Sequence, residues 1–175
     1  MVLLKGRRSV RKYLPEKVDR KKINLCLEAA RLAPSACNSQ PYKFIVIDDR
    51  QTKENLRTAF SGIYSPCSFA LSAPAIIAIV TQKQKLTAQI GNLMQNIDFR
   101  YVDIGIAGEH FVLQAQELGL GTCWIGWFDK KKVNAVLGIP GGLAVEVMIT
   151  LGYPAEKTKE RSKKSFAELV SYNEY

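Results

Sequence analysis

The segment DIGIAGEHFVLQAQELGLGTCWIG, residues 103–126, decides the fold that we predict for this chain. From about Asp98 to Leu118 apolar residues recur at helical spacing, which predicts one long buried helix. The apolar positions are Ile104, Ala107, Phe111, Ala115 and Leu118. Glycine in GLG is a typical helix end, and TCWIGWF, residues 122–128, follows as a strand. We therefore expect a central helix followed directly by a strand.

Three further strands are predicted outward from this segment. APAIIAIVT, residues 73–81, is a continuous apolar run, which is typical of a central strand that is covered on both faces. Tyr42 to Ile47 alternates and is rich in aromatic and β-branched residues. LAVEVMITLGY, residues 143–153, lies between turn signals and predicts the fourth strand.

Shorter helices are expected between these strands. Asp19 is placed to cap a helix that Pro34 terminates, and Asp129 to cap a short helix that runs through Leu137. A polar helix is expected at roughly residues 51–60. Since helices and strands alternate irregularly and 175 residues suit one domain, we predict a single α+β domain over residues 1–175, with one central sheet.

Composition narrows the class of protein. The 47% hydrophobic content and 23% charged content exclude a disordered chain. Net charge is +9, with basic residues concentrated in 5–22 and 157–164, which suits nucleic acid, an anionic membrane surface or a phosphorylated small molecule. A solvated basic surface is the simpler alternative. The sequence shows no signal peptide or membrane-spanning run, so we expect a cytoplasmic protein.

Common catalytic and metal motifs are absent from the sequence. It contains no GxGxxG after a strand, no GxxxxGK[ST], no GxSxG and no HExxH. The four cysteines form no CxxC pair and only one histidine is present, so we expect no metal site. His110 lies at helical spacing from Asp103 and Gln114, a pattern that would suit an acid–base pair. We expect it instead to be a polar residue at the edge of a packed helix face.

Two basic clusters and one polar loop remain as candidate binding segments. GRRSVRKYLPEKV, residues 6–18, sets three arginines around Ser9, a combination suited to a phosphate monoester. The loop PSACNSQP, residues 34–41, carries four polar side chains on a constrained turn, although turn formation alone would favour them. The basic tail with Arg161, Lys163 and Lys164 could meet the first cluster around one anion, or could be a solvated linker.

Several segments in this order resemble the FMN-dependent nitroreductase family. They are RRSVRKY at 7–13, AARLAPSACNSQPYKF at 29–44, APAIIAIV at 73–80, the segment 103–126, and GYP at 152–154 with the basic tail and FAELV at 166–170. The resemblance implies a sandwich whose mixed sheet is mainly antiparallel. It also implies a homodimer with FMN at the interface and a C-terminal tail that reaches the partner subunit.

The resemblance further implies roles for particular residues. Four residues of the N-terminal cluster would hold the phosphate and polar edge of the flavin: Arg7, Arg8, Ser9 and Arg11. A second group would approach that flavin from the other subunit: Pro34, Ser35, Asn38 and Gln40. Backbone around Ile125 and Gly126 would lie near the reactive ring nitrogen, and Arg161 or Lys163 would close on the phosphate. No side chain is expected to act as a catalytic acid or base.

The function so implied is hydride transfer from NADH or NADPH to a nitroaromatic, quinone or similar acceptor by ping-pong turnover. Flavin cleavage and reductive dehalogenation are alternatives within the same fold. A non-enzymatic FMN carrier or nucleic-acid binder is a third, although the basic segments lack the stacked aromatic residues of a nucleic-acid module. The chain departs from many family members at Pro66 and Phe69, where polar flavin contacts are usual.

Overall fold

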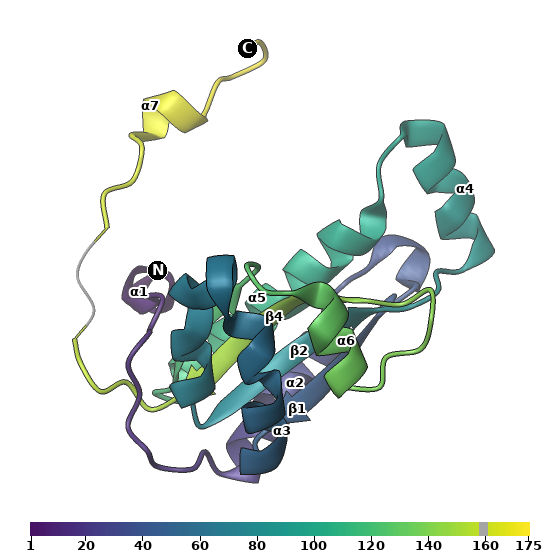
Figure 1. The fold of residues 1–175 in the computed structure, drawn as a ribbon. Helices are drawn as coiled ribbons and strands as arrows, with labels where there is room; N and C mark the ends of the chain where they lie inside the picture. Colours follow the sequence, from purple (N-terminus) through teal and green to yellow (C-terminus); the bar gives the residue numbers. More distant parts are fainter. Residues whose placement is uncertain (158–160) are drawn as a thin grey trace.

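The computed structural model describes residues 1–157 and 161–175. Its centre is a four-stranded sheet in the order β1-β2-β4-β3, and each neighbouring pair of strands is antiparallel (Figure 1). The strands are β1 (Tyr42–Ile47), β2 (Ala75–Thr81), β3 (Gly121–Ile125) and β4 (Val145–Gly152). A parallel pairing occurs where Ser9 bridges Thr122 at the free edge of β3. The mainly antiparallel α+β sheet is therefore confirmed.

The described part of the chain contains seven α-helices. They are α1 (Val2–Gly6), α2 (Arg20–Arg31), α3 (Arg50–Asn55), α4 (Leu86–Gln95), α5 (Phe99–Glu117), α6 (Lys130–Val136) and α7 (Phe166–Leu169). The predicted caps are confirmed, because the Asp19 side chain accepts from the Lys21 N–H and that of Asp129 from the Lys132 N–H. Short polar side chains at these positions bind the free N–H groups of a first helical turn.

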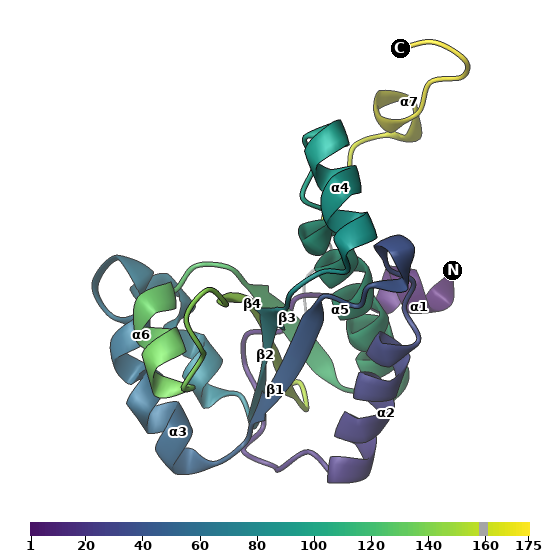
Figure 2. The same cartoon turned by 90° about the vertical axis from the view of Figure 1, so that its right-hand side faces the viewer.

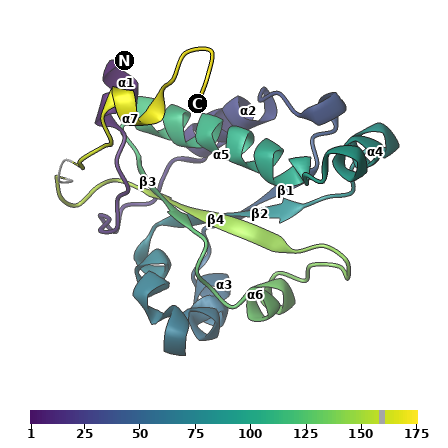
Figure 3. The ribbon, with the colours of Figure 1, turned by 90° about the horizontal axis from the view of Figure 1, so that it is seen from above.

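Helices cover both faces of the sheet (Figure 3). On one face α2 and α5 bury an apolar cluster that includes Ile77, Phe111 and Ile149. On the other face α6 and two 3₁₀ segments, Leu56–Phe60 and Gly62–Ser72, bury a second cluster. All seven residues of β2 are buried, as its continuous apolar run predicts.

Four details differ from the sequence-based prediction. The polar helix expected at 51–60 becomes a 3₁₀ helix at Leu56, which buries Leu56, Ala59 and Phe60. The third strand ends at Ile125 because Phe128 leaves the sheet and packs 6.4 Å from the ring of Phe60. Helices α1 and α4 were not predicted. Helix α1 has five residues, too few to show a helical period. For α4 the sequence did carry a signal, since its apolar residues Leu86, Ile90, Leu93 and Met94 recur at helical spacing.

Close packing between α5 and β3 leads to a first prediction. A Cβ atom added at Gly108 would lie 2.2 Å from Trp124 Cη2, whereas Gly105 on the same helix has nothing within 4 Å of such an atom. We expect Gly108→Ala to lower the free energy of unfolding by about 1–3 kcal/mol. Gly105→Ala should instead raise it by roughly 0.5–1 kcal/mol, since alanine favours the helix. Denaturant unfolding of both variants measures this, and equal effects would contradict it.

Candidate functional site

The N-terminal arm, residues 7–14, is attached to the edge of the sheet at β3. The Val10 N–H donates to the Thr122 carbonyl at 2.8 Å, and Val10 itself is buried. A side chain at Gly121 would collide with Val10, since an added Cβ would lie 2.6 Å from Val10 Cγ2. Glycine at this position therefore lets the arm lie directly on the strand.

The Tyr13 hydroxyl holds the arm against the sheet. It donates to the Val10 carbonyl at 2.6 Å and lies 2.6 Å from Thr150 Oγ1. Burial raises the pKa of Tyr13, so the phenol stays neutral. These contacts hold the arm's backbone in one position, and with it the basic side chains on either side of Val10.

The arm and the C-terminal tail meet at one cavity of about 490 Å³. It is lined by Met1, Leu4, Lys5, Arg7, Arg8, Ser9, Arg161 and Lys163. Five of these side chains are cationic and none is acidic, so the cavity is strongly electropositive. Five of the residues predicted for flavin binding thus lie together. Lys5, Met1 and Leu4 were missed, because only the short α1 helix carries them to the cavity wall.

Two arginines of this cavity have partners within the chain, Arg8 through hydrogen bonds and Arg7 through an ion pair. Arg8 donates to the carbonyls of Lys5 and Arg7, at 2.5 Å and 2.9 Å. Arg7 Nε lies 3.9 Å from Glu109 Oε1 of α5, a loose pair in which the Glu109 side chain is 44% exposed. The sequence carried a signal for Glu109, since it is an acidic residue on the long helix.

Arg11 does not line this cavity and contacts an aromatic ring instead. Its guanidinium carbon is 5.8 Å from the centre of the Phe69 ring. Burial raises the pKa of the Cys123 thiol, while the charges of Arg11 and Arg161 lower it. Both arginines therefore lie near that thiol. The predicted residue Ile125 is buried two positions further along β3, and Gly126 is exposed at the strand's end.

Trp127, the residue after Gly126, forms an aromatic pair with Tyr64 that was not predicted. The Trp127 ring is half exposed, and its Nε1–H donates to the Ile63 carbonyl at 2.7 Å. The Tyr64 ring lies 5.4 Å from it, centre to centre. These contacts hold two tilted aromatic rings, at 55° to each other, beside the end of β3.

The polar loop lies away from the cavity. Its start is held by α5, since the Ala36 N–H donates to Asp103 Oδ1 at 2.9 Å. The opposite part of α5 meets the end of α1, just before the arm, because an added Cβ at Gly6 would lie 3.4 Å from Gln116 Nε2. Asp103 and Gln116 are 13 residues apart, about 20 Å along a helix. Ser35, Asn38 and Gln40 are not among the residues that line the arm cavity of the same chain. The loop and α1 lie near opposite ends of α5 (Figure 3).

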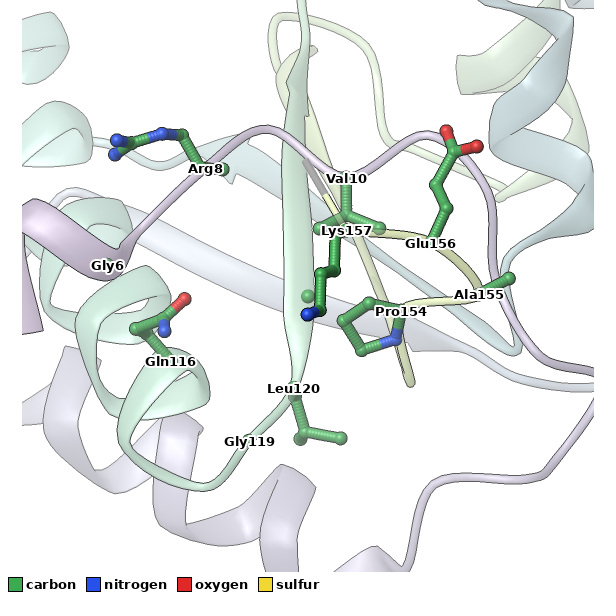
Figure 4. A pocket seen from close by; sticks show the side chains of 11 residues that line it. Gly6, Arg8, Val10, Gln116, Gly119, Leu120, Pro154, Ala155, Glu156 and Lys157 are labelled. Carbon is green, nitrogen blue, oxygen red and sulfur yellow. The ribbon is translucent and has the colours of Figure 1, made fainter. Parts of the chain in front are cut away.

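A second cavity of about 640 Å³ lies on the other side of the arm (Figure 4). Arg8 lines both cavities, but its side chain is directed away from Lys157. Here Glu156 adds a negative charge and pairs with Lys12 at 2.9 Å. The cavity also borders the C-terminus of α5, the negative end of the helix dipole. The smaller cavity is thus the better site for an anion.

The candidate residue His110 lies in a contact between two helices. His110 Nδ1 lies 3.3 Å from the Ala29 carbonyl, where α2 packs on α5. Over residues 1–157 and 161–175, no three His, Cys, Asp or Glu side chains gather closely enough to hold a metal ion. In the part of the chain that the structure describes, none of the helices combines the length and the apolar character needed to cross a membrane.

Comparisons with known proteins agree with this arrangement. The family model described as the nitroreductase family matches residues 4–66 and 64–153. A relative from Archaeoglobus fulgidus, provisionally named an NADH dehydrogenase or NAD(P)H nitroreductase, is 34% identical in an alignment of 156 positions that covers 86% of this chain and 83% of the relative.

Solved structures give the same result. A nitroreductase family protein from Clostridium novyi is 32% identical with a TM-score of 0.74, over 90% of this chain and 87% of the other. The FMN-dependent nitroreductase of Clostridium difficile is 31% identical with a TM-score of 0.79, over 99% of this chain and 98% of the other. With the matched residues spanning arm, loop and all four strands, the chain belongs to the nitroreductase family.

Proposed function

We propose that this chain binds FMN and transfers hydride from NADH or NADPH to a nitroaromatic, quinone or similar acceptor, with donor and acceptor using one site in turn. Family membership makes it an NAD(P)H-dependent oxidoreductase. The similar protein of C. difficile is FMN-dependent. The observation that carries the proposal is the meeting of cations from both chain ends at one cavity.

The donor set of the cavity fits the phosphate of FMN. Guanidinium groups of Arg7, Arg8 and Arg161 can bind phosphate oxygens in pairs, and Lys163 adds a point charge. Ser9 contributes a hydroxyl donor. A volume of about 490 Å³ lies within the range usual for small-molecule sites. These residues would therefore hold the phosphate end of the cofactor.

The remaining predicted residues would act around the ring. FMN, when bound, supplies the group that accepts and releases hydride. Arg11 would place a fixed positive charge beside it and so favour negative charge on the ring. The exposed backbone at Gly126 leaves room for a flat ligand at the end of β3. No side chain of this chain is assigned a proton-transfer step.

A homodimer would complete the site. We propose that Ser35, Asn38 and Gln40 of one protomer meet the flavin held by the arm of the other, because the loop and the arm cavity are separated along α5. Helices α4 and α7 project from the body of the domain (Figures 1 and 2). Their exposed apolar side chains are consistent with a protein interface: Leu86, Ile90, Leu93, Met94, Phe166 and Leu169.

The tail helix supports the same proposal. A capping box between Ser165 and Glu168 starts α7, but the helix has four residues and buries none of them. A helix this short is not stable in water without packing partners. Docking of α7 on a second protomer would supply them. The binding of nucleic acid gains no such support, since the cations gather around a cavity of small-molecule size.

The visible absorption spectrum of the purified protein tests the proposal. We expect a yellow protein whose flavin absorption is bleached by NADH or NADPH without oxygen and restored by a nitroaromatic or quinone. A colourless protein that does not bind added FMN would overturn the proposed function. If the protein is yellow but neither nucleotide bleaches it, FMN binding would be supported and the proposed hydride transfer would be overturned.

A further prediction concerns the charge of Glu109, which lies beside Arg7. Glu109→Gln removes the carboxylate that partly neutralises Arg7, so FMN should bind about 2–5-fold more tightly. Fluorescence titration of the apoprotein with FMN measures the change. Glu117→Gln is the matched control, because it removes the same charge from an exposed position on α5. An equal gain in both variants would show that net charge, and not Arg7, is responsible.

A further inference from the structure

A buried carboxyl on α5 has no role in the function proposed above. Asp103 is 2% exposed, and burial raises its pKa. Its Oδ1 atom accepts the Ala36 N–H at 2.9 Å, at the start of the polar loop. Its Oδ2 atom is buried and has no hydrogen-bond partner. A buried, half-satisfied carboxyl is costly, so its presence calls for a specific explanation.

Two more buried polar atoms without partners flank the same loop. The Tyr42 hydroxyl is one; burial raises the pKa of Tyr42, and the charge of Asp103 raises it further. The other is Gln84 Nε2, one residue before Lys85, whose N–H donates to Ser39 Oγ at 2.9 Å. In residues 1–157 and 161–175, all three such atoms therefore belong to residues around this loop.

The loop itself has a strained backbone. Cys37, Asn38 and Gln40 adopt positive φ angles of 52°, 49° and 47°, a region that side-chain-bearing residues rarely enter. The Gln40 N–H closes the turn by donating to Ser35 Oγ at 2.9 Å. Strain of this kind persists only where the surroundings impose it, and it is concentrated at functional sites.

We propose that Asp103 is the positioning residue of this loop. By binding the Ala36 N–H from beneath, it imposes the left-handed backbone that follows, and so sets the directions of Asn38 and Gln40. Asn38 Oδ1 accepts from Gln40 Nε2 at 2.7 Å, so these two side chains move as one unit. The contact between this unit and a flavin rests on the proposed function. The role of Asp103 in holding the loop is independent of that function.

Three variants separate this role from general stability. Asp103→Leu keeps the size of the side chain and removes the acceptor. Asp103→Asn is the conservative variant, since its amide oxygen can still accept the Ala36 N–H. Phe111→Leu is the matched control, because Phe111 is fully buried on the same helix and belongs to the core beneath the sheet.

Two measurements apply to each variant. Hydrogen exchange of the apoprotein reports on the amides of residues 36–40, and fluorescence titration gives the Kd for FMN. We expect Asp103→Leu to speed loop exchange about tenfold and to raise the Kd about tenfold. Asp103→Asn should stay within about threefold of the wild type in both. Phe111→Leu should lower the unfolding temperature while leaving both measurements unchanged.

The outcomes distinguish the parts of the proposal. Unchanged loop exchange in Asp103→Leu would overturn it, and so would an equal loss in Asp103→Asn or in Phe111→Leu. Faster exchange with an unchanged Kd would overturn the link between the loop and the flavin. A wild-type protein that binds no FMN would refute the proposed function, yet the exchange measurements would still decide whether Asp103 holds the loop.

Discussion

Arg7→Ala and Arg11→Ala are each expected to weaken FMN binding by about 1–3 kcal/mol, which is about 5–150-fold in Kd. Arg7 lines the cavity where both chain ends meet, and Arg11 lies beside Phe69 and near Cys123. A hydrogen bond from a guanidinium to an anion is about twice as strong as a neutral one. Fluorescence titration of the apoprotein with FMN measures both losses.

Controls separate local contacts from net charge. Arg20→Ala removes the same charge at the start of α2, where Arg20 pairs with Asp48, so it should leave the Kd for FMN unchanged. Arg7→Lys keeps the charge without the planar fork and should give an intermediate loss. If both alanine variants bind FMN as the wild type does, the arm has been assigned to the wrong ligand.

Shortening the tail is expected to have the largest effect on assembly. Ending the chain after Lys164 removes α7 and its exposed Phe166 and Leu169, but retains Arg161 and Lys163. We expect this variant to dimerise weakly, because the apolar side chains that would dock on a second protomer are gone. Sedimentation at several protein concentrations measures the change in association.

A longer truncation separates the two roles of the tail. Ending the chain after Pro154 also removes Arg161 and Lys163 from the cavity. FMN binding should then fall by a further factor of about ten or more, because two phosphate-binding cations are lost. A full-strength dimer in both truncated proteins would show that the tail does not bind its neighbour. Equal FMN affinity in both would show that Arg161 and Lys163 do not hold the phosphate.

Local sequence was a good guide wherever structure depends on residues within a turn or two. The predicted strand from Tyr42 to Ile47 is observed with the same bounds. The helix caps predicted at Asp19 and Asp129 are also observed. Helix α4 was missed although its apolar residues recur at helical spacing, and only the folded chain shows that this apolar face is exposed. Prediction also failed at Phe128, which leaves the strand to fill a gap beside Phe60.

For the candidate site too, local sequence indicated the residue types, whereas long-range contacts decided their placement. Residue types alone showed that both chain ends are basic and that residues 34–41 form a polar turn. Their placement needed the folded chain: Lys12 pairs with Glu156 across 144 residues, and Ser9 bridges Thr122. Asp103 became a functional candidate only when α5 was seen to hold the loop. Such contacts join segments that are distant in sequence, so no periodicity or spacing encodes them, and they form only when the sheet brings those segments together.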